Sequence, residues 1–279
     1  MRWGGLDLNY QTLILNTKSV RDFKKDVVKN ADLKIIKDYA NDCKRLVSSI
    51  DLEVRIMSNS EVYLTLDGIA GYKGHMVEAP SYIVLLSSVS DGYIQNAGYI
   101  GQELIFKATE IGVDSCWVTF TDSKAVKEKL NLVSEKEVVG IIALGFENNK
   151  AKAVKTTLNS AYRLGLDEIV YLNEWGKGAD NTALEERGIL DAFAFARLAP
   201  SAWNKQPWRF LIHGENVILA VKKGEEIYSY EEKIAAGVIM LYFQAIIDST
   251  LFRLNWHLDE PAISAGIPGD FKVVGYCNL

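Results

Sequence analysis

The sequence has few of the residues that build metal sites and disulfide frameworks. Its 279 residues include three cysteines and three histidines. The cysteines, Cys43, Cys116 and Cys277, are odd in number and widely spaced, which argues against a disulfide framework and indicates a reducing compartment. The histidines are scattered and have no spacing that suits a zinc ion. We therefore expect no bound metal and a cytoplasmic location.

Long apolar runs and an excess of positive charge are also absent from the sequence. The densest apolar run, Gly237 to Ile247, is far shorter than the ~20 residues that a bilayer-spanning helix needs. The first ten residues contain no apolar region of the kind found in signal peptides. A net charge of −5, without a stripe of Lys and Arg interleaved with aromatic residues, argues against a nucleic-acid surface. We expect a soluble globular protein with neither a membrane nor a nucleic acid as partner.

Proline is scarce, and two of the five prolines lie in one short turn. Residues 199–208 read Ala-Pro-Ser-Ala-Trp-Asn-Lys-Gln-Pro-Trp, between an expected amphipathic helix and an expected strand. Because Pro200 and Pro207 fix their own φ angles and hold the preceding residues extended, the turn is stiff. Its side chains that can hydrogen-bond a heteroaromatic edge are Ser201, Asn204 and Gln206. The turn is either a site for a planar ligand with a polar edge or a well-built helix stop.

The two halves of the chain repeat each other in the same order. Asn96-Ala-Gly-Tyr-Ile begins a helix-length segment that reaches Trp117, and Ala235-Ala-Gly-Val-Ile begins another that reaches Trp256. The two tryptophans are 139 positions apart, and so are the glycines of the two segments. We interpret the chain as two diverged copies of one α+β unit.

Shorter runs recur beside these helices. We expect a hairpin-like pair of β-rich strands in each copy. The expected strands are 54–57 with 62–66 in the first copy, and 208–212 with 217–221 in the second. The sequence Val-Val-Gly follows in both, at 138–140 and at 273–275.

A polar stretch, Asn173 to Asn181, is the expected linker between the copies. The first copy then spans residues 1–172 and carries a basic lead-in, and the second spans 182–279 and carries the proline-flanked turn. Because each copy lacks the feature that the other keeps, we expect the copies to pack as pseudo-symmetric partners with one shared site. The alternative is two independent domains.

The basic lead-in, Thr17-Lys-Ser-Val-Arg-Asp-Phe, precedes the first helix of the first copy. Lys18, Ser19 and Arg21 place two cations and a hydroxyl close together, an arrangement that suits a phosphate. Two further lysines nearby leave a solvated surface run as the alternative.

Taken together, the lead-in and the turn resemble the two parts of the flavin site in the nitroreductase family. Ser19-Val-Arg matches the family's Ser-x-Arg, and residues 200–208 match its Pro-Ser-x-x-Asn-x-Gln-Pro-Trp turn, which is the more specific motif. The stretches 79–85, 110–118 and 139–145 are similar to the family's central strand, helix-to-loop passage and closing strand. Over nearly its whole length, the chain is most similar to the subgroup in which two degenerate halves are fused in one chain.

The resemblance implies an α+β, nitroreductase-like fold whose two pseudo-symmetric halves pack as an intramolecular mimic of the family's homodimer. We therefore expect a monomer. It also implies that FMN is the cofactor. Lys18, Ser19 and Arg21 match residues that hold the ribityl phosphate and the pyrimidine side of the flavin, where a cation stabilises the reduced ring.

Other matching positions extend the implied flavin site. The residues that match the turn packed against the isoalloxazine ring are Pro200, Ser201 and Asn204. Thr119 falls where a backbone N–H meets flavin N5, and Arg163 matches a late basic residue that reaches the phosphate. Lys73 is implied as a further ring contact.

Two positions depart from the family's pattern. Thr17 stands where the family usually has a basic residue, which removes one charge from the phosphate side. Thr119 and Phe120 stand where the family has Glu-Gly, and Phe120 lacks the conformational freedom of glycine. These departures motivate two alternatives: a flavin- or ligand-binding module with degenerate catalytic activity, and a structural remnant.

The implied activity is that of an FMN-dependent oxidoreductase, which passes electrons from NAD(P)H through flavin to a nitroaromatic, a quinone or a similar small-molecule acceptor. Because the cofactor carries this chemistry, we name no catalytic side chain. Ser201 lies in no Gly-x-Ser-x-Gly sequence, which argues against hydrolysis.

Overall fold

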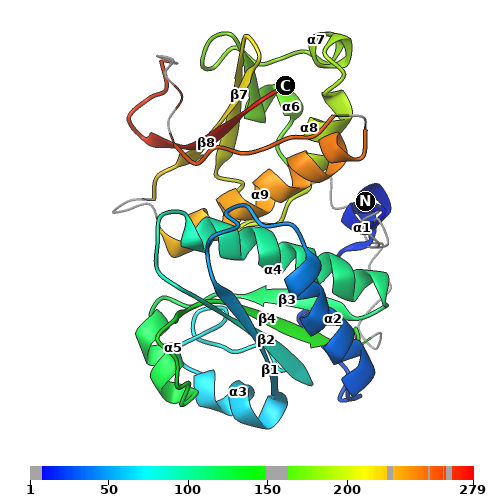
Figure 1. Cartoon of the computed structure of the whole chain (residues 1–279), viewed down its shortest axis with the longest axis vertical. Helices are drawn as coiled ribbons and strands as arrows, with labels where there is room; N and C mark the ends of the chain where they lie inside the picture. The colour runs from blue at the N-terminus through cyan, green and yellow to red at the C-terminus, as the bar shows by residue number, and fades with distance from the viewer. Residues whose placement is uncertain (1–7, 149–162, 225–228, 251, 260, 262–265) are drawn as a thin grey trace. The chain divides into compact units, whose positions relative to one another are not determined.

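The computed structural model describes residues 8–148, 163–224, 229–250, 252–259, 261 and 266–279 (Figure 1). The chain divides into two compact units, Met1–Ala153 and Val154–Leu279. Each unit combines helices with one four-stranded sheet, as the predicted α+β class requires. Within the described ranges, no helix is both long enough and apolar enough to cross a membrane.

The first unit is built on a sheet with the strand order β1-β2-β4-β3, in which all neighbours are antiparallel. Its strands are β1 (Leu52–Ser58), β2 (Ser81–Ser87), β3 (Asp114–Val118) and β4 (Glu137–Gly145). Its helices are α1 (Tyr10–Asn16), α2 (Asn30–Asp42), α3 (Asn59–Leu66), α4 (Tyr93–Glu110) and α5 (Ser123–Lys129). Figure 1 shows α4 along one side of this sheet and α3 and α5 along the other. Every residue of β2 is buried, as expected for a central strand with both faces covered.

Residues 62–66 lie in helix α3, so the predicted strand at this position is wrong. The backbone N–H of Ser58 donates to the Glu61 carboxylate at 2.7 Å, half of the capping box that a Ser-x-x-Glu sequence favours. Val62 and Leu66, four positions apart, are buried together on one side of the helix. The strand that pairs with β1 is instead β2.

The second unit has the strand order β5-β6-β7-β8; β5 is parallel to β6, and the other neighbours are antiparallel. Its strands are β5 (Val170–Leu172), β6 (Trp208–His213), β7 (Asn216–Lys222) and β8 (Phe271–Asn278). Its helices are α6 (Leu166–Ile169), α7 (Asn181–Glu186), α8 (Leu190–Ala196), α9 (Tyr230–Asp248) and the short 3₁₀ helix η2 (Ala202–Asn204). Strands β6 and β7 confirm the hairpin predicted for the second copy. Helix α9 packs against α8, with the Phe243 ring 4.8 Å from Phe193 and 5.9 Å from Trp256.

The division between the units falls upstream of the predicted linker at 173–181. Strand β5 pairs with β6, and the backbone N–H of Asn173 donates to the Ile212 carbonyl at 2.7 Å. These non-local bonds make the end of the predicted first copy part of the second unit's sheet. The structure divides the chain between Ala153 and Val154 instead.

Both sheets repeat one arrangement of strands and helix. An antiparallel strand pair is followed by a long, largely buried helix, α4 or α9, and by a strand that pairs with the second member of the pair. The register jumps from Gly140 to Val138 in β4 and from Gly275 to Val273 in β8. The middle valine of each Val-Val-Gly sequence is therefore the extra residue of a β-bulge. The duplication stays a prediction, and these matched bulges support it.

A buried carboxylate ties three helices of the first unit together. Glu103, on α4, has 1% of its surface exposed. The Tyr10 hydroxyl donates to it at 2.9 Å from α1, and the Tyr39 hydroxyl at 3.0 Å from α2. Burial raises the pKa of Glu103 from its ordinary value to about 7, although both hydroxyl bonds act in the opposite direction.

This raised pKa predicts that the Glu103→Gln variant changes the pH dependence of folding stability. Unfolding lets Glu103 ionise at its ordinary pKa of 4.5, so the parent loses stability as the pH rises from that value towards about 7. The loss amounts to about 3 kcal/mol, because each unit of pKa shift corresponds to about 1.4 kcal/mol. A glutamine cannot ionise, and the variant should lack this slope in urea unfolding at about pH 5 and about pH 8. Parallel pH profiles for the parent and the variant would contradict the assignment.

Candidate functional site

The basic lead-in of the first unit lies extended beside β3, an edge strand of its sheet. Ser19 pairs with Ser115 in a parallel bridge, and the backbone N–H of Val20 donates to the Ser115 carbonyl at 2.9 Å. Val20 is buried, whereas Lys18, Ser19 and Arg21 are exposed. The edge of β3 therefore fixes the backbone and leaves these three predicted site residues on the surface.

The cations of the lead-in have weak or neutral partners within the first unit. The Lys18 ammonium lies 3.6 Å from the Glu147 carboxylate, and both side chains are about half exposed, so the pair contributes little. The Arg21 guanidinium interacts with the Cys116 thiol. Burial nevertheless raises the pKa of Cys116 above its ordinary value, which keeps this thiol protonated. This environment makes Cys116 an unreactive buried thiol.

Thr17, which stands in place of the family's usual basic residue, has a structural role. Its hydroxyl donates to the Leu13 carbonyl at 2.8 Å and lies 3.2 Å from the hydroxyl of Thr109. The first bond satisfies a carbonyl at the end of α1, and the second joins α1 to α4. A lysine or arginine at position 17 would lose both bonds.

Lys73 and Thr119 lie on neighbouring segments at the other end of β3. The backbone N–H of Gly71 donates to the Thr119 carbonyl at 2.7 Å. Tyr72 and His75 then exchange two backbone hydrogen bonds across Lys73 and Gly74, whose φ angles are 53° and 83°. Two positive φ angles are the mark of a type I′ hairpin turn, which presents Lys73 at its exposed tip.

The backbone of Phe120 is not strained, although the family has glycine at this position. It is buried, bridges Ala70, and is not among the residues with a positive φ angle. Its ring therefore packs inside the first unit, and the strand geometry at this position does not require glycine.

Five predicted site residues thus surround one strand of the first unit. Ser115 and Thr119 are four positions apart, about 13 Å along an extended strand. Lys18, Ser19 and Arg21 lie near the first of these positions, and Lys73 lies near the second. The lead-in cations and Lys73 therefore lie near opposite ends of β3.

The turn of the second unit gathers the remaining predicted residues. Arg163 donates through one guanidinium nitrogen to Asn204 Oδ1 at 2.5 Å and through the other to the Leu198 carbonyl at 3.0 Å. Ser201 Oγ accepts from the backbone N–H of Gln206 at 2.9 Å, which closes the turn. Pro200 is half-buried between α8 and η2. Arg163, Pro200, Ser201 and Asn204 therefore form one cluster.

Two arginines, Arg163 and Arg197, place positive charge next to this turn. Burial lowers the pKa of the Arg163 guanidinium, and the nearby charge of Arg197 acts in the same direction. Burial raises the pKa of Tyr242, on α9, and keeps its hydroxyl neutral beside Arg163. An arginine remains protonated even so. Two guanidinium groups near a neutral hydroxyl make a region that favours an anion.

The backbone of the turn is strained. Trp203, Asn204 and Gln206 have φ angles of 57°, 53° and 47°. Positive φ angles are uncommon for residues other than glycine, and such strain is typical of functional sites. Trp203 is 52% exposed, so burial of its indole does not account for the conformation.

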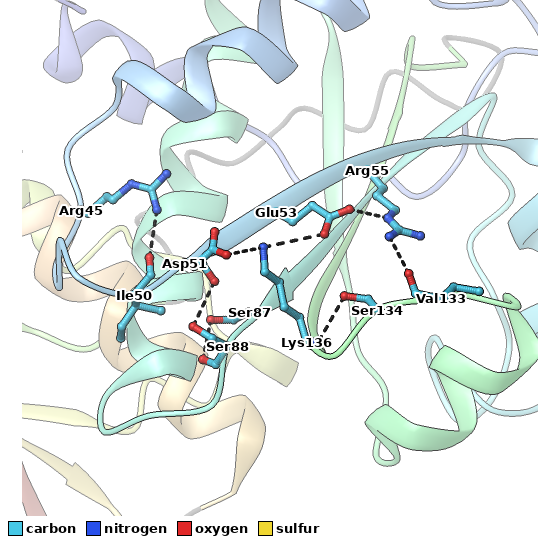
Figure 2. Close-up of polar contacts among 10 residues, drawn as sticks. All are labelled: Arg45, Ile50, Asp51, Glu53, Arg55, Ser87, Ser88, Val133, Ser134 and Lys136. Atoms are coloured by element: carbon cyan, nitrogen blue, oxygen red, sulfur yellow. Dashed lines mark hydrogen bonds and ion pairs between the residues drawn. The ribbon is translucent and has the colours of Figure 1, made fainter.

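A groove of about 860 Å³ lies at the opposite edge of the first unit's sheet, between β1, α2 and residues 130–136. Figure 2 shows that some of its charged side chains, those of Asp51, Glu53, Arg55 and Lys136, are paired with one another. The Lys136 ammonium lies 2.8 Å from the Asp51 carboxylate, and Arg55 Nε lies 2.6 Å from the Glu53 carboxylate. None of the predicted site residues lines this groove.

Comparison with known proteins identifies the family. The family model described as "Putative TM nitroreductase" matches residues 9–247, most of the chain. The chain therefore belongs to this nitroreductase family. Comparison with curated proteins gave no match.

A solved nitroreductase structure from Thermotoga maritima has the same fold, with a TM-score of 0.57 and 17% sequence identity, over 100% of this chain and 96% of that one. An FMN-dependent nitroreductase from Clostridium difficile is 21% identical, with a TM-score of 0.44, over 52% of this chain and 91% of that one. The family match and the T. maritima structure confirm the predicted nitroreductase-like α+β class.

The strain in the turn predicts a difference between two variants of Trp203. Both Trp203→Gly and Trp203→Ala remove the indole, but only alanine keeps a Cβ at a φ angle of 57°. We expect the glycine variant to be more stable by about 0.5–1 kcal/mol, after allowing for the greater freedom of glycine in the unfolded chain. Urea unfolding of the two proteins measures the difference. An alanine variant of equal or greater stability would show that the turn is relaxed.

Proposed function

We propose that this protein is an FMN-dependent oxidoreductase of the nitroreductase type. In this proposal NAD(P)H is the electron donor, and a nitroaromatic, a quinone or a similar small molecule is the acceptor. Family membership supports the reaction class. The single observation that carries the cofactor assignment is the strained turn of the second unit, where the Arg163 guanidinium is bonded to Asn204.

The residues around β3 have the chemistry that the phosphate and the pyrimidine edge of FMN require. Lys18 and Arg21 are exposed cations, and the guanidinium of Arg21 can bind phosphate oxygens in pairs. Ser19 adds a hydroxyl that donates or accepts. Lys73 adds a third cation beside the strand end at Thr119, whose backbone N–H we assign to the flavin N5 edge.

The turn of the second unit has the chemistry that the ring requires. Pro200 and Ser201 give a stiff surface on which a planar ring can pack, and the Asn204 carboxamide is held in one orientation by Arg163. The Arg163 guanidinium provides positive charge for the phosphate. We assign Arg163, Pro200, Ser201 and Asn204 to the same flavin as the residues around β3, with one site in each chain.

FMN, when bound, supplies the chemistry of hydride transfer. The residues of this chain then have to bind the ribityl phosphate, orient the ring and stabilise negative charge on its pyrimidine side. These tasks need cations and fixed donors rather than an acid–base pair. We therefore assign no catalytic side chain.

Spectroscopy of the purified protein tests the proposed function. We expect FMN to bind and give a yellow protein, NAD(P)H to bleach it, and a quinone to restore the colour. A yellow protein that no nicotinamide bleaches would support a flavin-binding module instead. A protein that stays colourless with added FMN would overturn the proposal and favour a structural remnant.

Two variants test whether residues of both units serve one flavin. Arg21→Ala and Asn204→Ala each remove a charged or oriented hydrogen-bonding group, and we expect each to weaken FMN binding by about 10- to 100-fold. Fluorescence titration measures the dissociation constant. Lys25→Ala is the matched control, because it removes an exposed cation near Arg21 that the proposal does not use. Parent-like affinity in either site variant would contradict a shared site.

A further inference from the structure

Gln206 is the buried member of an otherwise exposed part of the turn. The residue is 6% exposed, whereas its neighbours Trp203, Asn204 and Lys205 are exposed. Burying a carboxamide is costly unless its polar atoms are hydrogen-bonded. The oxygen and the nitrogen of the buried Gln206 carboxamide therefore both need hydrogen-bond partners.

The Gln206 carboxamide joins the turn to a distant segment of the second unit. Its Oε1 accepts from the backbone N–H of Leu164 at 2.9 Å, although Leu164 lies 42 positions earlier in the chain. Its Nε2 donates to the Asn204 carbonyl at 3.3 Å. Because Ser201 Oγ also accepts from its backbone N–H, Gln206 is bonded through both main chain and side chain.

These two carboxamide bonds lie on either side of the Arg163–Asn204 pair. Leu164 directly follows Arg163, and the other bond holds the backbone of Asn204 itself. One side chain thus fixes the backbones from which both members of the pair extend. The 2.5 Å bond between Arg163 and Asn204 depends on that spacing.

We infer that Gln206 is a positioning residue of the proposed flavin site, and that it acts through Arg163 and Asn204 without touching the cofactor. This inference rests on the proposed function. An amide is required because one group must accept from Leu164 and donate to Asn204 at the same time. An ionised carboxylate has no hydrogen to donate and would face the Asn204 carbonyl with a negative charge.

The Gln206→Glu variant tests the requirement for a donor. At about pH 8 the carboxylate is ionised, and we expect FMN affinity to fall at least about tenfold below that of the parent. At about pH 5 a protonated carboxyl can both accept and donate, so the deficit should shrink, since burial raises the pKa of a carboxyl. Fluorescence titration with FMN at both pH values measures the ratio of dissociation constants. Gln11→Glu, in the exposed part of α1, is the control for the change of charge.

The Gln206→Met variant and a double-mutant cycle test whether Gln206 acts through Asn204. Methionine has a similar length but makes neither hydrogen bond. We expect Gln206→Met to weaken FMN binding in the parent and to weaken it by a smaller factor in the Asn204→Ala background, because the two residues are coupled. The Gln206→Met variant also tests the inference if the Gln206→Glu variant does not fold.

The outcomes separate this inference from the proposed function. A parent that binds no FMN overturns both. A parent that binds FMN, together with Gln206 variants of equal affinity, overturns the inference alone. A deficit that is the same at both pH values and additive with Asn204→Ala also overturns it, because that result describes a general loss of packing.

Discussion

The hydrogen bond between Arg163 and Asn204 is the interaction on which the proposed site depends. It holds a charged group and an oriented amide together in a turn whose backbone carries three positive φ angles outside glycine. Such a conformation persists only when surrounding contacts impose it. Those contacts come from Ser201 and Gln206 within the turn and from Leu164 outside it. The two flanking prolines, Pro200 and Pro207, stiffen the same turn and limit the ordering cost of binding a ligand.

The first unit holds its predicted site residues in place by backbone pairing instead of side-chain hydrogen bonds. There, the unpaired edge of β3 takes up the lead-in through main-chain bonds, so the cations need no bonds of their own to be held near the strand. Lys73 is presented by a tight type I′ hairpin bonded to Thr119. Backbone pairing leaves charged side chains available for an anion, whereas the second unit orients its groups by side-chain bonds. The two units therefore hold their predicted site residues in place by different kinds of hydrogen bond.

Local signals predicted much of this structure. The proline-flanked turn and the strands at 208–212 and 217–221 follow from residues that restrict their own backbones, and they were confirmed. The strand predicted at 62–66 was wrong because its apolar alternation competes with a helix cap at Ser58 and Glu61. The pairing of β5 with β6 and the bond from Leu164 to Gln206 are non-local, so no pattern in the sequence indicated them. The contact between Thr17 and Thr109, which joins α1 to α4, was missed for the same reason.

The number of flavins bound by each chain tests the central claim most directly, because a site served by residues of both units exists once. Saturating the purified protein with FMN, removing the excess and measuring flavin absorbance against protein concentration gives this ratio. The account predicts one FMN per chain. A ratio of two would mean that each unit binds flavin by itself, and a ratio of zero would mean that the residues gathered around β3 and the turn serve another purpose.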